Sequence, residues 1–377
     1  MFRSGDAGVD DSSSIALATE RVQRAIRVTD SLCYLGPDSL LVLLDDLADG
    51  LAAARVADRI LAGLEGACEP EGGERLFGEV GIGLHPEDGS TTDALLAAAQ
   101  RALDESTGEG ASRFWFSSRP IHRRAVRRAR VERALRRDLA SMAFEVHYQP
   151  RIDLRTSEVV GVEALLRYNP ADLGPVTPGE IVPLLEEMEK IDAVGEWVLR
   201  EACRVSAEWE RLGHPLVVGV NVSAHQVEVG RLDRAVERAL AETGASPELL
   251  ELELTEGVLL ENTAGTRELL SSLRSRGVRI AVDDFGTGYA SLRYVKHFPM
   301  DVLKIDREFV RGLPTDPENA AITSAIIALA HRLGIEVVAE GVEDAAEEQF
   351  LRENRCDYVQ GFLRARPMPS DRIVPFL

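Results

Sequence analysis

The sequence is poor in cysteine and in long apolar segments. Its four cysteines, at positions 33, 68, 203 and 356, stand far apart with no C-x-x-C pair. This spacing predicts neither a zinc knuckle nor a disulfide framework, and it favours a reducing compartment. No apolar run approaches the ~18 residues of a membrane span. The N-terminus also lacks the basic start and apolar stretch of a secretory signal, so we expect a cytoplasmic protein without a membrane span.

Basic charge is also scarce. The chain has 43 basic and 63 acidic residues, which gives a net charge of -20 at pH 7, and its lysines are only Lys190, Lys296 and Lys304. A surface with this excess of negative charge repels polyanions, so extended nucleic-acid binding is not expected. A small phosphorylated ligand is compatible with this charge, because metal ions in a pocket can reverse the local potential.

The length and composition predict a folded chain with more than one domain. The chain has 377 residues, of which 45% are hydrophobic and 28% are charged, and these values suit two globular domains. We predict a small α/β domain over residues 1–118, a basic linker helix over residues 119–139 and a barrel over residues 140–377. The patterns of the first domain indicate a helix at residues 17–28, a strand at 40–44, a helix at 51–64, a glycine-rich strand at 80–84 and a helix at 94–103.

One segment of the chain is strongly basic. Its eight arginines face a single Glu132 before Asp138, and they are Arg123, Arg124, Arg127, Arg128, Arg130, Arg133, Arg136 and Arg137. Apolar residues recur at helical spacing in the same segment, so the arginines can project from the other face of one helix. We favour a solvated linker helix over a nucleic-acid-binding arm, because no aromatic residue lies between the arginines to stack on bases.

The remainder of the chain repeats an apolar, strand-like run followed by a helical stretch. Residues 140–377 have the length of a (βα)8 barrel, in which catalytic groups lie at the C-terminal ends of the strands. Polar residues end the successive runs, and they are Glu163, Asn221, Glu253, Asp283, Asp284, Asp306, Glu340 and Gln360, together with Lys304. We therefore expect an α/β barrel of the TIM type with these side chains around one rim.

Several carboxylates around one rim would repel one another, and a single lysine is too little to balance them. Divalent cations would supply the missing positive charge, and ligation by oxygen alone favours Mg²⁺ or Mn²⁺ over zinc. The adjacent Asp283 and Asp284 suggest a two-metal arrangement, which serves phosphoester hydrolysis. The alternative is that single acids are helix N-caps or turn residues. Asp306 and Glu256 are most open to that alternative, whereas the recurrence at successive strands argues against it as a whole.

These residues belong to a set of eight motifs that occur in order along the barrel segment. They are Tyr148-Gln149-Pro150, Glu163-Ala164-Leu165-Leu166-Arg167, Val220-Asn221-Val222-Ser223, Glu253-Leu254-Thr255-Glu256, Asp283-Asp284-Phe285-Gly286-Thr287-Gly288, Lys304-Ile305-Asp306, Glu340-Gly341-Val342-Glu343 and Gln360-Gly361. With these motifs the segment resembles the EAL domain of cyclic di-GMP phosphodiesterases. The resemblance implies a TIM-like barrel with one antiparallel strand, which linearises cyclic di-GMP to pGpG with two Mg²⁺ or Mn²⁺ ions.

The resemblance also implies a role for each matching residue. The first metal would be held by Glu163, Asn221, Glu253 and Asp283, and the second by Asp283, Asp284 and Glu340. Glu340 could instead be the general base, although two metals make a separate strong base less necessary, so we favour the ligand role. Lys304 would orient the nucleophilic water or stabilise developing charge, with help from Gln360. Contacts to the substrate would come from Gln149, Arg167 and Glu343.

A loop completes the site that the resemblance implies. In the family this loop couples metal binding to a homodimer contact and is steadied by Glu256, and its residues here include Phe285, Gly286, Thr287 and Gly288. The two glycines permit the backbone turns of a mobile loop, with a tight turn as the plain alternative. No matched catalytic position departs from the family pattern. We therefore expect an active phosphodiesterase, and a catalytically silent cyclic di-GMP receptor that signals through a protein partner is the alternative.

The first domain resembles a diguanylate cyclase domain more weakly. The segment Leu35-Gly36-Pro37-Asp38-Ser39-Leu40 stands where that family has its G-G-D-E-F signature. Pro37 removes a backbone N–H, and Ser39 replaces the acid that would bind metal. The family's first half, with its metal-binding strand, finds no counterpart before Ala16. The resemblance therefore implies a truncated, degenerate cyclase-like domain without cyclase activity, in a regulatory or structural role.

Overall fold

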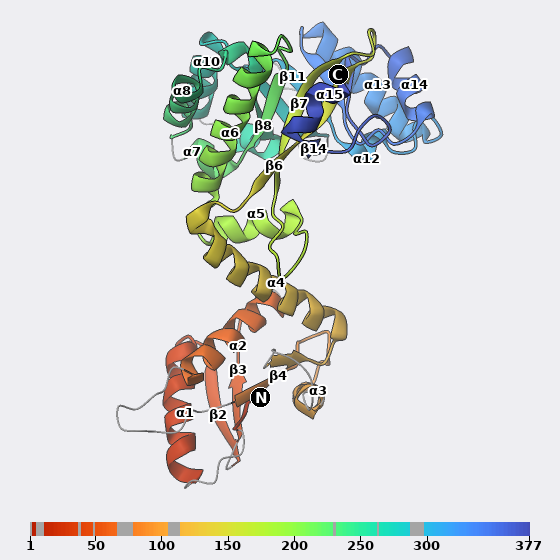
Figure 1. Cartoon of the computed structure of the whole chain (residues 1–377). Helices are drawn as coiled ribbons and strands as arrows, with labels where there is room; N and C mark the ends of the chain where they lie inside the picture. The colour runs from red at the N-terminus through yellow and green to blue at the C-terminus, as the bar shows by residue number, and fades with distance from the viewer. Residues whose placement is uncertain are drawn as a thin grey trace. The chain divides into compact units, whose positions relative to one another are not determined.

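The computed structural model describes residues 2–4, 11–36, 39–47, 50–65, 78–104, 114–228, 231–261, 264–286 and 298–377. Contacts between residues divide the chain into two compact units, Met1–Arg137 and Asp138–Leu377. Figure 1 labels the helices and strands of both units. Among the described residues, no helix is long and apolar enough to cross a membrane.

The first unit contains a five-stranded sheet in the order β2-β3-β1-β4-β5. Its strands are β1 (Phe2–Ser4), β2 (Ser31–Gly36), β3 (Ser39–Leu43), β4 (Gly78–Ile82) and β5 (Phe114–Phe116). Only β4 and β5 are parallel, and the other pairs are antiparallel. The sequence patterns did not predict β1, which lies between β3 and β4 and occupies the middle of the sheet. Three residues are too few to show a strand period, so only their pairing identifies this strand.

The helices of this unit are α1 (Asp11–Ala25), α2 (Gly50–Glu65), α3 (Thr92–Asp104) and α4 (Arg119–Asp138). All four were predicted, although α1 begins and ends earlier than the predicted residues 17–28. Its buried face explains the shift, because Ile15, Ala18, Val22 and Ala25 recur at helical spacing and all enter the core of the unit. The basic segment forms α4, and its Ala125 also belongs to that core.

The second unit is built around a closed barrel of eight strands, which confirms the predicted TIM-like fold. The strands are β6 (Glu145–Asp153), β7 (Val159–Arg167), β8 (Val217–Val222), β9 (Leu250–Thr255), β10 (Arg279–Phe285), β11 (Val302–Ile305), β12 (Glu336–Ala339) and β13 (Tyr358–Val359). Strands β7 to β13 run parallel, and β6 is antiparallel to both β7 and β13, where it closes the barrel. A short β14 (Met368–Pro369) also pairs with β6.

Helices surround the barrel, as Figure 1 shows for α6, α8, α10, α13 and α14. Their bounds are α5 (Pro178–Glu187), α6 (Ile191–Arg211), α7 (Ala224–Glu228), α8 (Leu232–Thr243), α9 (Glu256–Glu261), α10 (Ala264–Ser275), α12 (Arg307–Val310), α13 (Pro317–Arg332), α14 (Ala345–Glu353) and α15 (Ile373–Phe376), with 3₁₀ turns at Leu139–Ser141, Pro247–Leu249 and Ser370–Arg372. Helix α6 illustrates the packing, because its buried Trp209 meets Tyr148 of β6 edge to face, with ring centroids 5.2 Å apart.

The alternation of side chains along the strands places polar groups inside the barrel. Successive residues of a strand point to opposite faces, so the apolar Leu252 and Leu254 of β9 point away from the interior, whereas Glu251 and Glu253 point into it. The same parity directs Ala281 and Asp283 of β10 inward, and Ala281 packs with Val302 and Val338 in a small internal cluster. The barrel interior therefore holds charged side chains beside this small apolar cluster.

Candidate active site

Side chains from five strands, and from the segments after β12 and β13, gather at the C-terminal end of the barrel. Most of them lie inside the strands, whereas the sequence analysis placed them just after each strand. Glu163 is in β7, Asn221 in β8, Glu253 in β9, Asp283 in β10 and Lys304 in β11, while Glu340 follows β12 directly and Gln360 follows β13. The difference arises because the strands were predicted from their apolar runs, and their pairing with neighbouring strands continues past the end of each run.

The acids form two overlapping groups. Carboxylate oxygens of Glu163, Glu253 and Asp283 lie within 4.8 Å of one another, and the same holds for Asp283, Asp284 and Glu340. Asp283 belongs to both groups, so it could bridge two ions. All ligand atoms are oxygens, which suits hard divalent cations such as Mg²⁺ and Mn²⁺.

Lys304 is the cation at the centre of these acids, and it is completely buried. Its Nζ lies 2.5 Å from Glu253 Oε2, 2.6 Å from Glu340 Oε1, 3.3 Å from Asp283 Oδ2 and 3.7 Å from Glu163 Oε2. Burial alone would lower the pKa of Lys304, but the four surrounding carboxylates raise it well above its usual value. The lysine therefore stays charged, and its one positive charge faces four carboxylates.

Neutral amides fix the orientation of Glu163. Asn221 Nδ2 donates to Glu163 Oε1 at 2.7 Å, and Gln360 Nε2 donates to Glu163 Oε2 at 2.6 Å. Burial tends to raise the pKa of Glu163, but Lys304 and the two amide donors outweigh it and lower that pKa below its ordinary value. Gln149 extends the network, because its Oε1 accepts from Gln360 Nε2 at 3.3 Å. Glu163 is therefore a fixed carboxylate at the rim.

Glu253, Glu340 and Asp284 hold their protons more strongly than free carboxylic acids. Burial, with the charges of Glu163 and Asp283, raises the pKa of Glu253 well above its usual value despite Lys304. Burial also raises the pKa of Glu340 to about 8. The pKa of Asp284 rises to about 6 through burial and the neighbouring charges of Asp283 and Asp306. These shifts express an excess of buried negative charge, which a bound cation would relieve.

The turn at Asp283 and Asp284 sends the two carboxylates to different places. Asp284 has a φ of 54°, a left-handed conformation that Asp tolerates better than most residues. Its backbone N–H donates to Asp283 Oδ1 at 2.9 Å. Asp283 is buried and belongs to both acid groups, whereas Asp284 is more exposed and also interacts with Asp306. Asp306 itself caps α12 by accepting from the Glu308 backbone N–H.

The predicted coupling loop lies partly within the described residues. Glu256 begins α9 and is buried, and its Oε2 accepts from the backbone N–H of Gly286 at 3.1 Å. Phe285 is buried at the end of β10, and Gly286 has a φ of 107° that suits glycine. Thr287 and Gly288 lie outside the described residues. The contact between Glu256 and Gly286 joins the end of β9 to the end of β10.

Two predicted substrate contacts, Arg167 and Glu343, make no hydrogen bond to this cluster among the described contacts. Arg167 ends β7, and its Nη1 donates to the backbone carbonyl of Leu166 at 2.9 Å. Burial lowers the pKa of Arg167, with Glu163 acting in the opposite direction. Glu343 is exposed in the segment before α14, where its backbone N–H donates to Glu347 Oε2 at 2.8 Å. Among the described contacts, none brings the Glu343 side chain to the acids.

The sequence analysis missed two charged residues below the acid cluster. Arg151 of β6 is 2% exposed and Glu251 of β9 is fully buried, and the two form a hydrogen-bonded ion pair. Arg151 also lies 3.4 Å from Glu253 Oε1. The spacing of Glu251 and Glu253 two residues apart in an apolar strand is a signal that could have found the pair, because both must point to the same face.

A bound cation fits this site on two further observations. Gln360 Oε1 is buried, and no hydrogen-bond partner reaches it from the part of the chain that the structure describes. The five acids, Glu163, Glu253, Asp283, Asp284 and Glu340, outnumber the one lysine among them. Buried carboxylates in this excess require more positive charge or more protons.

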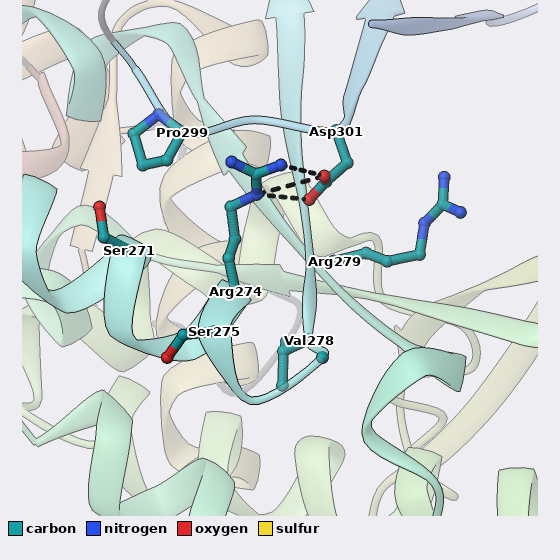
Figure 2. A pocket seen from close by; sticks show the side chains of 8 residues that line it. Ser271, Arg274, Ser275, Val278, Arg279, Pro299 and Asp301 are labelled. Carbon is teal, nitrogen blue, oxygen red and sulfur yellow. Dashed lines mark hydrogen bonds and ion pairs between the residues drawn. The ribbon is translucent and has the colours of Figure 1, made fainter.

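A hollow lies at the N-terminal end of strands β10 and β11, opposite the acid cluster. It has a volume of about 380 Å³ and is lined by residues from the end of α10, the start of β10 and the segment before β11. Figure 2 shows Arg274 reaching across it to Asp301, with Arg274 Nη2 2.6 Å from Asp301 Oδ1. Arg279 also lines this hollow and binds Glu251, so it links the hollow to the buried charges inside the barrel.

Comparison with known proteins identifies the family. The EAL domain family matches residues 132–367, which cover the barrel and every acid of the cluster. The chain belongs to the EAL-domain family. Among curated relatives, the bifunctional diguanylate cyclase/cyclic di-GMP phosphodiesterase MucR of Pseudomonas aeruginosa is 36% identical over 357 residues, which are 94% of this chain and 52% of MucR. The cyclic di-GMP phosphodiesterase NbdA of the same species is 36% identical over 365 residues, which are 96% of this chain and 46% of NbdA.

Solved structures of EAL domains resemble the second unit. The phosphodiesterase of MucR in complex with c-di-GMP is 41% identical with a TM-score of 0.62, and the match covers 65% of this chain and 99% of that one. An EAL domain protein from Listeria monocytogenes is 30% identical with a TM-score of 0.58, covering 66% of this chain and 96% of that one. The chain spans about half the length of the curated relatives it matches.

Proposed function

We propose that this chain is a phosphodiesterase that hydrolyses cyclic di-GMP to linear pGpG with two divalent cations, Mg²⁺ or Mn²⁺. The observation that carries the proposal is the acid cluster around Lys304, in which the acids predicted to bind the metals lie close together. The relatives of this chain also include phosphodiesterases of this substrate. A relative of 41% identity was also solved in complex with c-di-GMP.

The two acid groups would hold one cation each. Glu163, Asn221, Glu253 and Asp283 would bind the first ion, and Asp283, Asp284 and Glu340 would bind the second. The spacing of the carboxylates, within 4.8 Å in each group, supports this division. When bound, such a pair of ions supplies Lewis acidity toward the phosphate and activates water for in-line attack.

The other residues would position the reactants. Lys304 is held by four carboxylates, so its ammonium group is fixed where it can orient a water molecule or stabilise developing charge. Gln360 keeps Glu163 in place, and its Oε1, which has no partner among the described residues, could accept from the same water. Arg167 would pair with a phosphate through its planar guanidinium, and Gln149 and Glu343 would contact the rest of the substrate.

The first unit would serve as a degenerate, cyclase-like domain in a regulatory or structural role. The alignment with MucR extends over 94% of this chain and so includes this unit. Its Pro37 and Ser39 spoil the signature of an active cyclase. We also propose that the chain forms a homodimer through the barrel, with the contact between Glu256 and Gly286 coupling that interface to the second cation.

The test is hydrolysis by the full chain carrying Glu163→Gln. The unchanged protein should convert cyclic di-GMP to pGpG with Mg²⁺ or Mn²⁺, and no product should form after chelation. Glu163→Gln should reduce turnover by more than the ~10- to 100-fold typical of residues that only support a metal ligand. Glu158→Gln makes the same change at an exposed site directly before β7 and should leave turnover unchanged.

Chromatography of the nucleotide products would measure turnover, and calorimetry would measure ligand binding in the same samples. Binding of cyclic di-GMP without any pGpG from the metal-loaded protein would contradict the proposal and favour a receptor. Equal turnover by Glu163→Gln and Glu158→Gln would show that the acid cluster takes no part in hydrolysis.

A further inference from the structure

A chain of charges runs below the acid cluster; it is buried from Glu253 to Glu251 and becomes partly exposed at Arg279 and Glu336. It begins at Glu253, continues through Arg151 to Glu251, and reaches Arg279 and then Glu336. The side chains of Glu251 and Glu253 are fully buried, and that of Arg151 is 3% exposed. Ions buried this deeply persist only when each is paired, because their removal from water is costly.

The two oxygens of Glu253 are held by different cations. Lys304 Nζ lies 2.5 Å from Oε2, on the side of the acid cluster, and Arg151 Nη2 lies 3.4 Å from Oε1, on the side away from it. Gly219 of β8 makes room for this arrangement, because a Cβ there would overlap Glu253 Oε1. The carboxylate is therefore clamped from both ends and cannot turn without losing one cation.

Arg151 is free to serve Glu253 because Glu251 has a second partner. Arg279 Nε lies 3.2 Å from Glu251 Oε2, and Arg279 also pairs with Glu336. Arg151 therefore does not neutralise Glu251 alone, and part of its charge is available to Glu253. A pair that served stability only would need no contact with Glu253.

We propose that Arg151 is a positioning residue for metal binding, which acts by holding Glu253 Oε1 so that Oε2 faces Lys304, Glu163 and Asp283. This inference rests on the proposed function, since it assigns Glu253 to the first cation. Outer residues that orient a metal ligand commonly change metal affinity by ~10- to 100-fold. The charge of Arg151 and the length of its side chain should both matter.

The test compares three variants of the full chain. The double variant Arg151→Met/Glu251→Gln removes the buried pair without leaving one of its charges alone, and Arg279 keeps Glu336 as partner. Arg151→Lys keeps the charge on a side chain without the guanidinium fork. The control is Arg155→Met, because Arg155 is 86% exposed and pairs only loosely with Asp153 at 3.7 Å.

Calorimetry with Mn²⁺ alone, without substrate, is the deciding measurement. The double variant should bind Mn²⁺ about 10- to 100-fold more weakly than the unchanged chain, and Arg151→Lys should recover part of the loss. With cyclic di-GMP, the double variant should lose kcat at saturating Mn²⁺ while KM changes little. Thermal unfolding of the metal-free variants should stay close to that of Arg155→Met, which shows that the barrel is intact.

The outcomes separate this inference from the proposed function. An intact double variant with the Mn²⁺ affinity of the unchanged chain would overturn the positioning role alone. If the double variant unfolds at a lower temperature than Arg155→Met, Arg151→Lys becomes the deciding variant. If Arg151→Lys then binds Mn²⁺ as tightly as the unchanged chain, the positioning role is also overturned. Weaker Mn²⁺ binding by the variants of a chain that forms no pGpG would support the positioning role and refute the proposed function. Absence of Mn²⁺ binding by the unchanged chain would refute both.

Discussion

Glu340 and Asp284 are the acids of the cluster whose pKa values lie near neutral pH, at about 8 and about 6. Both pKa values exceed those of free carboxylic acids, so each residue keeps its proton over a pH range in which a free acid has already lost it. A cation needs both groups deprotonated, and it must therefore displace these protons when it binds. The pH dependence of metal binding follows from this competition.

We predict that the affinity for Mn²⁺ rises with pH between about 6 and 8 and levels off above 8. Displacement of one proton raises affinity by roughly tenfold per pH unit, so the rise should approach ~100-fold over this range. Calorimetry in two buffers of different ionisation enthalpy would count the protons released. Glu340→Gln should bind Mn²⁺ more weakly, and its Mn²⁺ affinity should no longer rise with pH above pH 6. An affinity that is flat from pH 6 to pH 8 would contradict the assignment of Glu340 as a ligand.

At the scale of elements, helix α14 fixes the segment that carries Glu340. Asp344 caps this helix by accepting from the backbone N–H groups of Ala346 and Glu347. Glu347 is buried, and its carboxylate accepts from Glu343 at 2.8 Å, from Asp344 at 3.3 Å and from Gly312 at 3.1 Å. One carboxylate thus ties the turn after β12 to the turn after α12.

We predict that Glu347→Ala lowers the free energy of unfolding by about 2 to 4 kcal/mol, because it leaves three backbone donors without this acceptor. Chemical denaturation monitored by circular dichroism would measure the loss. Glu353→Ala changes an exposed residue of the same helix and should shift stability by no more than ~0.5 kcal/mol. Equal midpoints for the two variants would show that other groups take over the three donors.

The elements also show which features the sequence could predict. Glu163, Asn221, Glu253 and Asp283 were found because apolar runs of parallel strands are local patterns, and the rule that their C-terminal ends converge needs no coordinates. The same patterns placed the helices α2, α3 and α4. Strand β1 was missed because three residues show no period, and only its two partners define it.

The buried pair of Arg151 and Glu251 could not be predicted in the same way. The two residues are 100 positions apart, on β6 and β9, which are not neighbours in the sheet. Their contact exists only across the interior of a closed barrel, and a local pattern says nothing of which strands face each other. Glu343 illustrates the converse, since a local motif was enough to single it out; its side chain is exposed, and its contact with the substrate stays a prediction.

At the scale of the whole molecule, the site depends on closure of the barrel. Gln149 and Gln360 meet although 211 positions separate them, and Glu163 and Gln360 are 197 apart. The complete cluster therefore cannot exist in an unfolded chain. A ligand that binds only the folded state stabilises it, so metal ions should raise the unfolding temperature of the barrel as their concentration increases.

The division of contacts predicts that the barrel unit folds and acts without the first unit. Residues 138–377 keep the hydrogen bond from Tyr168 Oη to Asp138, and they contain every residue of the cluster. The solved phosphodiesterase of MucR is matched over 99% of its length by 65% of this chain, so a chain of about this size is stable in a relative.

We predict that the fragment unfolds cooperatively, unfolds at a higher temperature with Mn²⁺, and still forms pGpG. Glu163→Gln in the fragment should abolish turnover while leaving the metal-free unfolding temperature nearly unchanged. A fragment that aggregates, or that binds Mn²⁺ without turnover while the full chain is active, would show that the first unit completes the enzyme.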